Sequence, residues 1–297
     1  MIIKSTHIID TFAEAFSLRF SRIIVTAHDK YWLDAALSAA CGYGTSVIGC
    51  DAEIGVERRL PETDTPDGRV GAAILAFGFS SEALGKAITN RAAQCLLTCP
   101  TVSIFDDLPS AEVRSPFGSH IRYFGDGFEK SKLIDGHRFW RIPVMDGEFF
   151  VEESIGIEKG IGGGNFILQG DSLSATLHAA RLAVDTISTV PGTITPFPGG
   201  VVRSGSKVGS RYTGLKASTN DSFCPALVGR TVTQLVEGAA CALEIVIDGT
   251  DEQTISSAMT VGIHAAAQPG ILAISAGNYG GKLGKFHFHL HQILNAS

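Results

Sequence analysis

The first half of the chain alternates short apolar runs with segments in which apolar residues recur at helical spacing. Runs rich in β-branched residues predict strands over 22–27, 45–50, 70–79 and 96–105. Apolar residues three and four positions apart predict helices over 30–41 and 81–95. Thr11 and Glu14 have the spacing of a capping box, which predicts a short helix over DTFAEAF (10–16). This order of strands and helices is typical of a split βαβ unit, as in ferredoxin-like folds.

The second half repeats such units with more glycine between them. The same patterns predict strands over 148–152, 241–247, 271–275 and 286–290, and helices over 172–188 and 251–267. A Pro-Gly pair follows each helix, and GNF (164–166) echoes GNY (277–279). Because glycine becomes more frequent here, we divide the chain into an N-terminal α/β lobe (1–145) and a C-terminal α/β lobe (146–297).

These patterns predict an α+β protein with two ferredoxin-like (split βαβ) lobes and mixed or antiparallel sheets. A doubly wound parallel sheet is the alternative, but no glycine fingerprint for a dinucleotide follows the first strand. The chain has 297 residues, 44% of them hydrophobic and 18% charged, which is enough for a substantial core.

Composition and charge exclude several classes of protein. The formal net charge of -6 argues against a nucleic-acid partner. The N-terminus lacks the continuous apolar segment of a signal peptide, and the longest apolar run, 70–79, is too short to span a membrane. We therefore expect a cytoplasmic protein. The six cysteines are scattered without a CxxC pair, which indicates free thiols rather than a metal site.

One glycine-rich segment, Thr195–Asp221, is basic in an otherwise acidic protein. Its cations are Arg203, Lys207, Arg211 and Lys216, and no acidic residue precedes Asp221. Backbone N–H groups and cations together suit an anionic ligand, whereas composition alone favours a solvated loop. PFPGG (196–200) indicates a specified turn, and the apolar residues after it indicate that the loop is anchored in a core.

Most catalytic motifs fail in this sequence. Gly200-x-x-x-x-Gly205-Ser206-Lys207 nearly forms a phosphate loop, but Val208 stands where a hydroxyl should bind magnesium. No serine occupies the nucleophile elbow of a hydrolase. Alternate histidines over 287–291 would share a strand face and could bind zinc, but a polar strand face explains them better, since no other ligand type lies close in sequence.

Glu244 is the remaining candidate. In the strand over 241–247, Leu243, Ile245 and Ile247 share one face and Glu244 points to the other. A lone carboxyl on such a strand is usually solvated. If the face is covered, desolvation raises its pKa, and the protonated acid can donate a hydrogen bond to an oxyanion.

The chain resembles formylmethanofuran:tetrahydromethanopterin formyltransferase over nearly its whole length. The resemblance rests on many motifs in one order: DTFAEAF (10–16), TPDGR (65–69), FGDG (124–127), WRIPV (140–144), GGNF (163–166), PFPGG (196–200), VRSGSKVGS (202–210), ASTND (217–221), CP (224–225), EIVIDG (244–249), SAGNYGGKLG (275–284) and HLH (289–291). It thins over 56–60, 109–121 and 229–236, where we assign no site.

The resemblance implies a two-lobed α/β enzyme that moves a formyl group between the amine of methanofuran and N5 of tetrahydromethanopterin. These coenzymes are substrates, and no prosthetic group or metal takes part. The cations of the basic loop would bind the anionic tails of these coenzymes. The family's implicated carboxyl matches Glu244, which would donate to the oxyanion of a tetrahedral intermediate. The residues that we expect to position the substrates lie in two glycine-rich loops: Gly199, Gly200, Arg203, Ser206, Lys207, Asn220, Asn278, Gly280, Gly281 and Lys282.

Direction and partners follow from the same resemblance. In methanogens the family loads formyl onto the pterin, whereas related chains of methylotrophic bacteria run in reverse beside a formyl-hydrolase. The modest net charge favours the reverse direction slightly. We expect a homo-oligomer, dimer or tetramer, or a hetero-oligomer with hydrolase subunits. A non-catalytic subunit of a formyl-processing complex is the alternative, although such a chain could have lost Glu244. A formamide hydrolase would need a metal or a base near the carbonyl.

Overall fold

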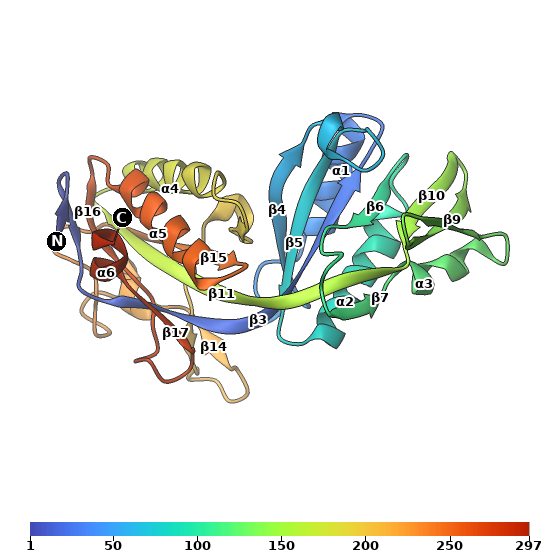
Figure 1. Ribbon diagram of the computed structural model, residues 1–297. Helices are drawn as coiled ribbons and strands as arrows, with labels where there is room; N and C mark the ends of the chain where they lie inside the picture. The colour runs from blue at the N-terminus through green and yellow to red at the C-terminus, as the bar shows by residue number, and fades with distance from the viewer. Residues whose placement is uncertain (297) are drawn as a thin grey trace. The chain divides into compact units, whose positions relative to one another are not determined.

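A computed structural model describes residues 1–296, which form two compact units. The middle unit is Leu18–Gly160, and the terminal unit combines Met1–Ser17 with the residues from Ile161 onward. The chain passes from one unit to the other within two long strands, β3 (Phe12–Thr26) and β11 (Ser154–Gly170) (Figure 1). The division expected between residues 145 and 146 falls in the turn of the β9–β10 hairpin.

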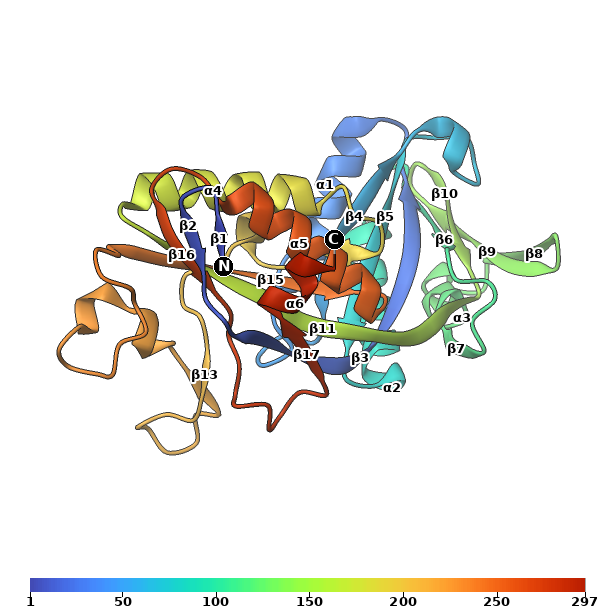
Figure 2. The ribbon, with the colours of Figure 1, turned by 60° about the vertical axis from the view of Figure 1, so that its left-hand side comes forward.

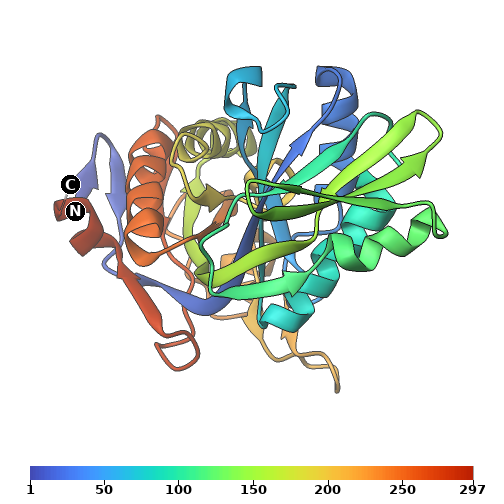
Figure 3. The same cartoon turned by 45° about the vertical axis from the view of Figure 1, so that its right-hand side comes forward.

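The middle unit contains a split βαβ motif. Its elements follow the order β3, α1 (Lys30–Cys41), β4 (Glu53–Leu60), β5 (Gly71–Gly78), α2 (Ser81–Arg91) and β6 (Ser103–Asp106). The sheet order is β4-β5-β3-β6, with every neighbouring pair antiparallel. Both helices pack on the same face of this sheet, in a core that includes Ile23, Leu37 and Ile88 (Figure 3).

Further strands extend the middle unit. β6 pairs in parallel with β10 (Gly147–Glu152), which continues through β9 (His137–Val144) to β8 (Lys130–Ile134). β7 (Val113–Pro116) pairs with the start of β11, and α3 (Gly118–Ile121) follows it. Short helical turns occupy Glu62–Asp64, Ala92–Leu96 and Arg122–Gly125.

The terminal unit repeats the same topology. Its elements are β11, α4 (Leu173–Ile187), β12 (Thr193–Ile194), β15 (Cys241–Gly249), α5 (Glu252–Ala266) and β16 (Ile271–Ser275). The sheet order β16-β11-β15-β12 is again antiparallel throughout. Figure 1 shows α4 and α5 side by side, and their alanines pack in one core with the apolar face of β15.

Several smaller elements complete the terminal unit. β2 (Thr6–Ile8) pairs with β16 and with β1 (Ile2–Ile3), and β17 (Phe286–His289) pairs with the first half of β3 before α6 (Leu290–Asn295). The hairpin of β13 (Lys207–Val208) and β14 (Ala217–Ser218) lies in the basic loop. Figure 2 shows this region, gold to orange, standing away from the β11–β15 sheet. Short helical turns lie at Pro198–Gly200, Asp221–Phe223 and Pro225–Leu227.

The predicted fold class, two ferredoxin-like arrangements with mixed and antiparallel pairing, is confirmed. Two local predictions are wrong. Most of the expected helix over 10–16 is the start of β3, because residues 12–15 pair with β17 and the Glu14 carboxylate accepts hydrogen bonds from a distant loop. The expected strand over 45–50 forms turns, and Glu53–Leu60 supplies the strand instead. The strand expected over 96–105 is confined to Ser103–Asp106.

Candidate active site

Glu244 lies in β15, at the centre of the sheet of the terminal unit. The alternation of β15 buries Leu243, Ile245 and Ile247 against the helices, as the sequence pattern predicts. Glu244 therefore points to the opposite face, level with Ile167 of β11 in the strand register. Ile167 pairs with Glu244 on one side and with Ser275 of β16 on the other.

Two glycine backbones flank the Glu244 carboxyl. A Cβ placed on Gly277 would lie 3.4 Å from Oε1, and one placed on Gly205 would lie 3.6 Å from Oε2. Within residues 1–296 the carboxyl makes no hydrogen bond, so nothing offsets its desolvation. Burial raises the pKa of Glu244 to about 7 from the ordinary value of 4.5. A large share of the molecules therefore carries a neutral, donor-competent acid near neutral pH.

The basic loop is anchored to Glu244 through its backbone. The Val202 amide donates to the Glu244 carbonyl at 2.8 Å, and the Glu244 amide donates back at 2.9 Å. Beyond this bridge the chain turns at Gly205, whose φ of +54° is unfavourable for other residues. A Cβ there would lie 2.7 Å from the Cβ of Asn220, so Gly205 is the residue that lets the loop pass between Asn220 and Glu244.

Asn165 of β11 fixes the other glycine. The Gly277 amide donates to Asn165 Oδ1 at 2.6 Å, and Asn165 Nδ2 donates to the Gly277 carbonyl at 3.1 Å. Nδ2 also donates to the Gly163 carbonyl at 3.0 Å. The buried Asn165 amide thus has partners on both its oxygen and its nitrogen, and it holds the Gly277 backbone beside the Glu244 carboxyl.

Glu14 organises the loop that follows Gly277. Its Oε2 accepts from the amides of Tyr279 and Gly281 at 2.7 and 2.9 Å. Its Oε1 accepts from the amides of Leu283 and Gly284, both at 2.6 Å. Burial alone would raise the pKa of Glu14, but these four donors outweigh it and hold that pKa below its ordinary value. Glu14 is thus a buried carboxylate enclosed by the 277–284 loop.

A pair of hydroxyls joins the two loops beside Glu244. Ser206 Oγ lies 3.3 Å from Tyr279 Oη, and the Tyr279 ring packs against Phe16 with the ring centroids 6.2 Å apart. Ser206 follows Gly205, and Tyr279 lies two residues after Gly277. The two loops whose glycines border Glu244 are therefore joined to each other through these hydroxyls.

The other predicted site residues have different surroundings. Lys207 Nζ donates to Asp221 Oδ2 at 2.6 Å, so its charge is already paired, and this contact lowers the pKa of Asp221. Asn278 Nδ2 donates to Thr11 Oγ1 and the Phe12 carbonyl, which ties the loop to the strand. Four predicted cations, Arg203, Arg211, Lys216 and Lys282, are exposed.

The glycine turns have structural explanations. Gly199 and Gly200 adopt φ of +62° and +75°, as the PFPGG turn requires, and Gly200 is buried against Val184 of α4. Gly280 and Gly281 both adopt φ of +72°. The Gly281 amide is used by Glu14 and the Gly280 amide by Asn278 Oδ1, so neither is free for a ligand.

No motif in the sequence assigns a site role to Asn165, Tyr279 or Gly277, or the loop-holding role to Glu14. The echo of GNF (164–166) and GNY (277–279) was the available signal, because the structure places Asn165 and Gly277 in contact. Glu14 was assigned to a helix cap, since its real partners lie 265 or more residues away.

Only two of the three alternate histidines share a strand face. His287 and His289 both lie in β17 and pack against Phe12, with ring centroids 5.0 and 5.1 Å away. His291 lies in α6 and contacts the Ile8 carbonyl through Nε2 at 2.8 Å. Over residues 1–296 no group of three or more metal-ligating side chains gathers. Also within this range, the six cysteines are free, and no helix is long and apolar enough to cross a membrane.

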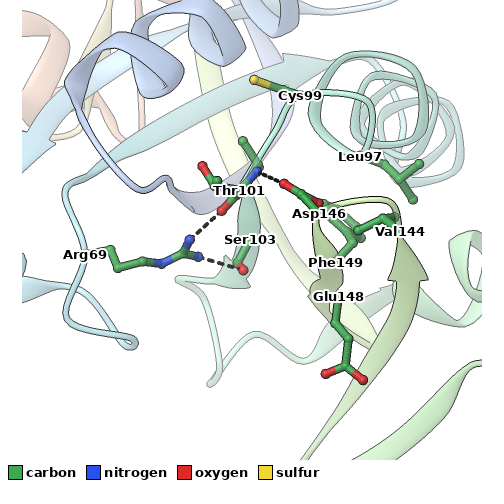
Figure 4. Close-up of a pocket in the computed structure, with 10 residues that line it drawn as sticks. Arg69, Leu97, Cys99, Thr101, Ser103, Val144, Asp146, Glu148 and Phe149 are labelled. Atoms are coloured by element: carbon green, nitrogen blue, oxygen red, sulfur yellow. Dashed lines mark hydrogen bonds between the residues drawn. The ribbon is translucent and has the colours of Figure 1, made fainter.

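A separate cavity of about 320 Å³ lies in the middle unit (Figure 4). Arg69 at its edge donates to the Thr101 carbonyl and, at 2.8 Å, to Ser103 Oγ, while the Thr101 amide donates to Asp146 Oδ2 at 2.6 Å. Because these lining groups are bonded to one another, the cavity offers few convergent donors, and Glu244 remains the better candidate for chemistry.

Both halves of the chain match known protein families. Residues 1–144 match the family model described as formylmethanofuran-tetrahydromethanopterin formyltransferase, and residues 147–293 match the model described as FTR, proximal lobe. The formyltransferase of that name from Rhodopirellula baltica is 52% identical and the alignment covers 98% of this chain and 92% of the relative.

Two solved structures share the fold. The formyltransferase from Methanosarcina barkeri superposes with a TM-score of 0.94 at 46% identity, covering 99% of this chain and 100% of the other. A chain of the formyltransferase/hydrolase complex from Methylorubrum extorquens, solved with methylofuran, gives 0.93 at 44% identity, covering 97% and 96%.

Proposed function

The chain belongs to the formylmethanofuran:tetrahydromethanopterin formyltransferase family and is a formyltransferase, and we propose that Glu244 is the acid at which it transfers formyl between the two coenzymes. The observation that carries this proposal is a carboxyl with a pKa of about 7, unbonded within residues 1–296 and flanked by two glycine backbones. Glycines at these positions leave room for a formyl carbon to approach the acid.

The proposed step is a direct attack. The amine nitrogen of the acceptor coenzyme forms a bond to the formyl carbon, and the carbonyl electron pair moves to oxygen. Protonated Glu244 donates a hydrogen bond to this oxyanion and keeps its proton. When the carbonyl re-forms, the bond from carbon to the donor nitrogen breaks, and the proton lost by the attacking amine balances the one gained by the leaving nitrogen. Hydrogen bonds aimed at a developing oxyanion lower such barriers by about 3–4 kcal/mol.

The loops around Glu244 supply positioning. Ser206 and Tyr279 join the two loops that border it, and the exposed cations of the basic loop suit the anionic tails of the coenzymes. Holding two large coenzymes in register contributes a further share of the acceleration. Lys207 belongs to this set only if a coenzyme displaces Asp221 from it.

The direction we propose runs from formyl-tetrahydromethanopterin to methanofuran, in the cytoplasm. One solved relative stands in a formyltransferase/hydrolase complex. A hydrolase that consumes a formylated furan coenzyme would draw the transfer in this direction. We accordingly propose a hetero-oligomer with hydrolase subunits rather than a homo-oligomer.

The test is a transfer assay with the purified chain, alone and with such hydrolase subunits. Formyl-tetrahydromethanopterin and methanofuran are supplied, and both products are quantified. Transfer by the isolated chain is the expected result. Transfer in neither preparation would refute the catalytic function and favour a structural subunit, whereas net formation of formyl-tetrahydromethanopterin under cellular coenzyme ratios would refute the direction.

A further inference from the structure

Glu14 is a buried, charged residue that the oxyanion mechanism does not use. It lies in β3 opposite His287 of β17, far in sequence from every other part of the site. Its carboxylate accepts four backbone amides from one six-residue stretch, Tyr279–Gly284. A ring of backbone N–H groups around one anion is an arrangement that proteins otherwise use to bind ligand anions.

We propose that Glu14 is a positioning residue for formyl transfer: it holds the 277–284 loop so that Gly277 lies beside Glu244 and Tyr279 meets Ser206. This inference rests on the function proposed above. The carboxylate takes the place that a ligand anion would have in such a loop. The amides of Gly281 and Leu283 therefore serve the protein itself and not the coenzymes.

The contacts connect Glu14 to Glu244 in two steps. The Glu14 amide donates to the Gly277 carbonyl at 3.2 Å, and the Glu14 carboxylate accepts from the Tyr279 amide. The backbone and the side chain of Glu14 therefore fix the first turn of the loop at Gly277 and at Tyr279. Gly277 then borders the Glu244 carboxyl, and Tyr279 meets Ser206. Gly284 closes the loop against β3, where a Cβ would lie 2.4 Å from the Ala15 carbonyl.

Only a carboxylate satisfies this geometry. Each of its two oxygens accepts two amides, whereas a glutamine offers one oxygen and one NH₂ group. In Glu14→Gln the NH₂ group would face two N–H donors, and that half of the loop must move away. The substitution therefore removes the anchor with almost no change in side-chain volume.

The experiment compares Glu14→Gln with wild type in the transfer assay and by hydrogen exchange of the loop amides. We expect kcat to fall about 100-fold while KM stays within about threefold, because misplacement by about 1 Å has effects of this size on positioned groups. Exchange at Gly281, Leu283 and Gly284 should accelerate. Asp251→Ala is the matched control, since Asp251 accepts the Thr254 amide at the start of α5 and lies outside the loop.

The outcomes separate the two hypotheses. A kcat within about twofold of wild type, with the loop amides exposed to exchange, would overturn the positioning role. An equal loss of kcat in Asp251→Ala would also overturn it, because general destabilisation would then explain both variants. If Glu14→Gln does not fold, Glu14→Asp decides: it keeps the charge but sets the carboxylate back by one methylene from the four amides, and an unchanged kcat with faster exchange of those amides would contradict the proposal. Failure of wild type to transfer formyl would refute the proposed function itself.

Discussion

Glu244→Gln should stabilise the folded protein, and more so as the pH rises. Folding takes the Glu244 carboxyl into a desolvated position and raises its pKa from 4.5 to about 7. When folding raises the pKa of a carboxyl, the native state loses stability as the pH rises above the unfolded pKa, because the unfolded chain releases this proton first. Glu244 therefore costs the folded protein no stability below about pH 4.5. The cost grows as the pH rises from there to about 7. Glutamine is neutral at every pH and escapes this loss.

The magnitude follows from the two pKa values. At about 1.36 kcal/mol per pH unit, a rise from 4.5 to about 7 corresponds to a loss of about 3 kcal/mol at high pH. Because most of that loss falls between pH 5 and pH 8, the stability of the variant relative to wild type should grow by about 2.5 kcal/mol over this interval. Any packing difference between Glu and Gln adds an offset that does not depend on pH.

The assay is urea unfolding of both proteins at several pH values, followed by fluorescence and by circular dichroism. Glu237→Gln, at an exposed position, serves as control and should track wild type. The refuting result is the same pH dependence in Glu244→Gln and wild type. If the difference between their free energies of unfolding changed by less than about 0.5 kcal/mol from pH 5 to pH 8, Glu244 would not be desolvated and the reasoning about its proton would fail.

Two other predictions concern the loops. Gly277→Ala should lower kcat at least about tenfold, because the new methyl lies 3.4 Å from Glu244 Oε1 and 3.2 Å from Asn165 Oδ1, which must move. Gly280→Ala is strained at φ +72° but faces open space, so urea unfolding should show a loss of stability while kcat stays close to that of wild type. Lys207→Met should change the KM for either coenzyme less than Arg203→Met does, because Asp221 already pairs with Lys207. Steady-state kinetics at low salt measure both values, and a larger rise in KM for Lys207→Met would contradict the prediction.

Strand periodicity was sufficient to predict the position of Glu244. The alternation around it placed three apolar residues toward the core and the carboxyl on the other face, and the structure has this arrangement. The order of strands and helices likewise predicted both split βαβ units. Such features are local, so a single sequence contains them.

Long-range pairing explains what the sequence did not predict. Thr11 and Glu14 satisfy the spacing of a helix cap, yet pairing with β17 and the bonds to the 277–284 loop keep them extended. Asn165 and Gly277 are 112 residues apart, and nothing in either segment alone indicates that one holds the other. The ionic partner of Lys207 also depends on the β13–β14 hairpin, which brings Asp221 within 2.6 Å.

The most direct test of the central claim is the kcat of Glu244→Gln in formyl transfer from formyl-tetrahydromethanopterin to methanofuran. Glutamine keeps a hydrogen-bond donor but is a far weaker acid with different geometry. If a protonated Glu244 stabilises the oxyanion, kcat falls about 100-fold or more while the fold remains intact. A kcat equal to that of wild type would contradict the account and move the search for the catalytic group to the hydroxyls of Ser206 and Tyr279.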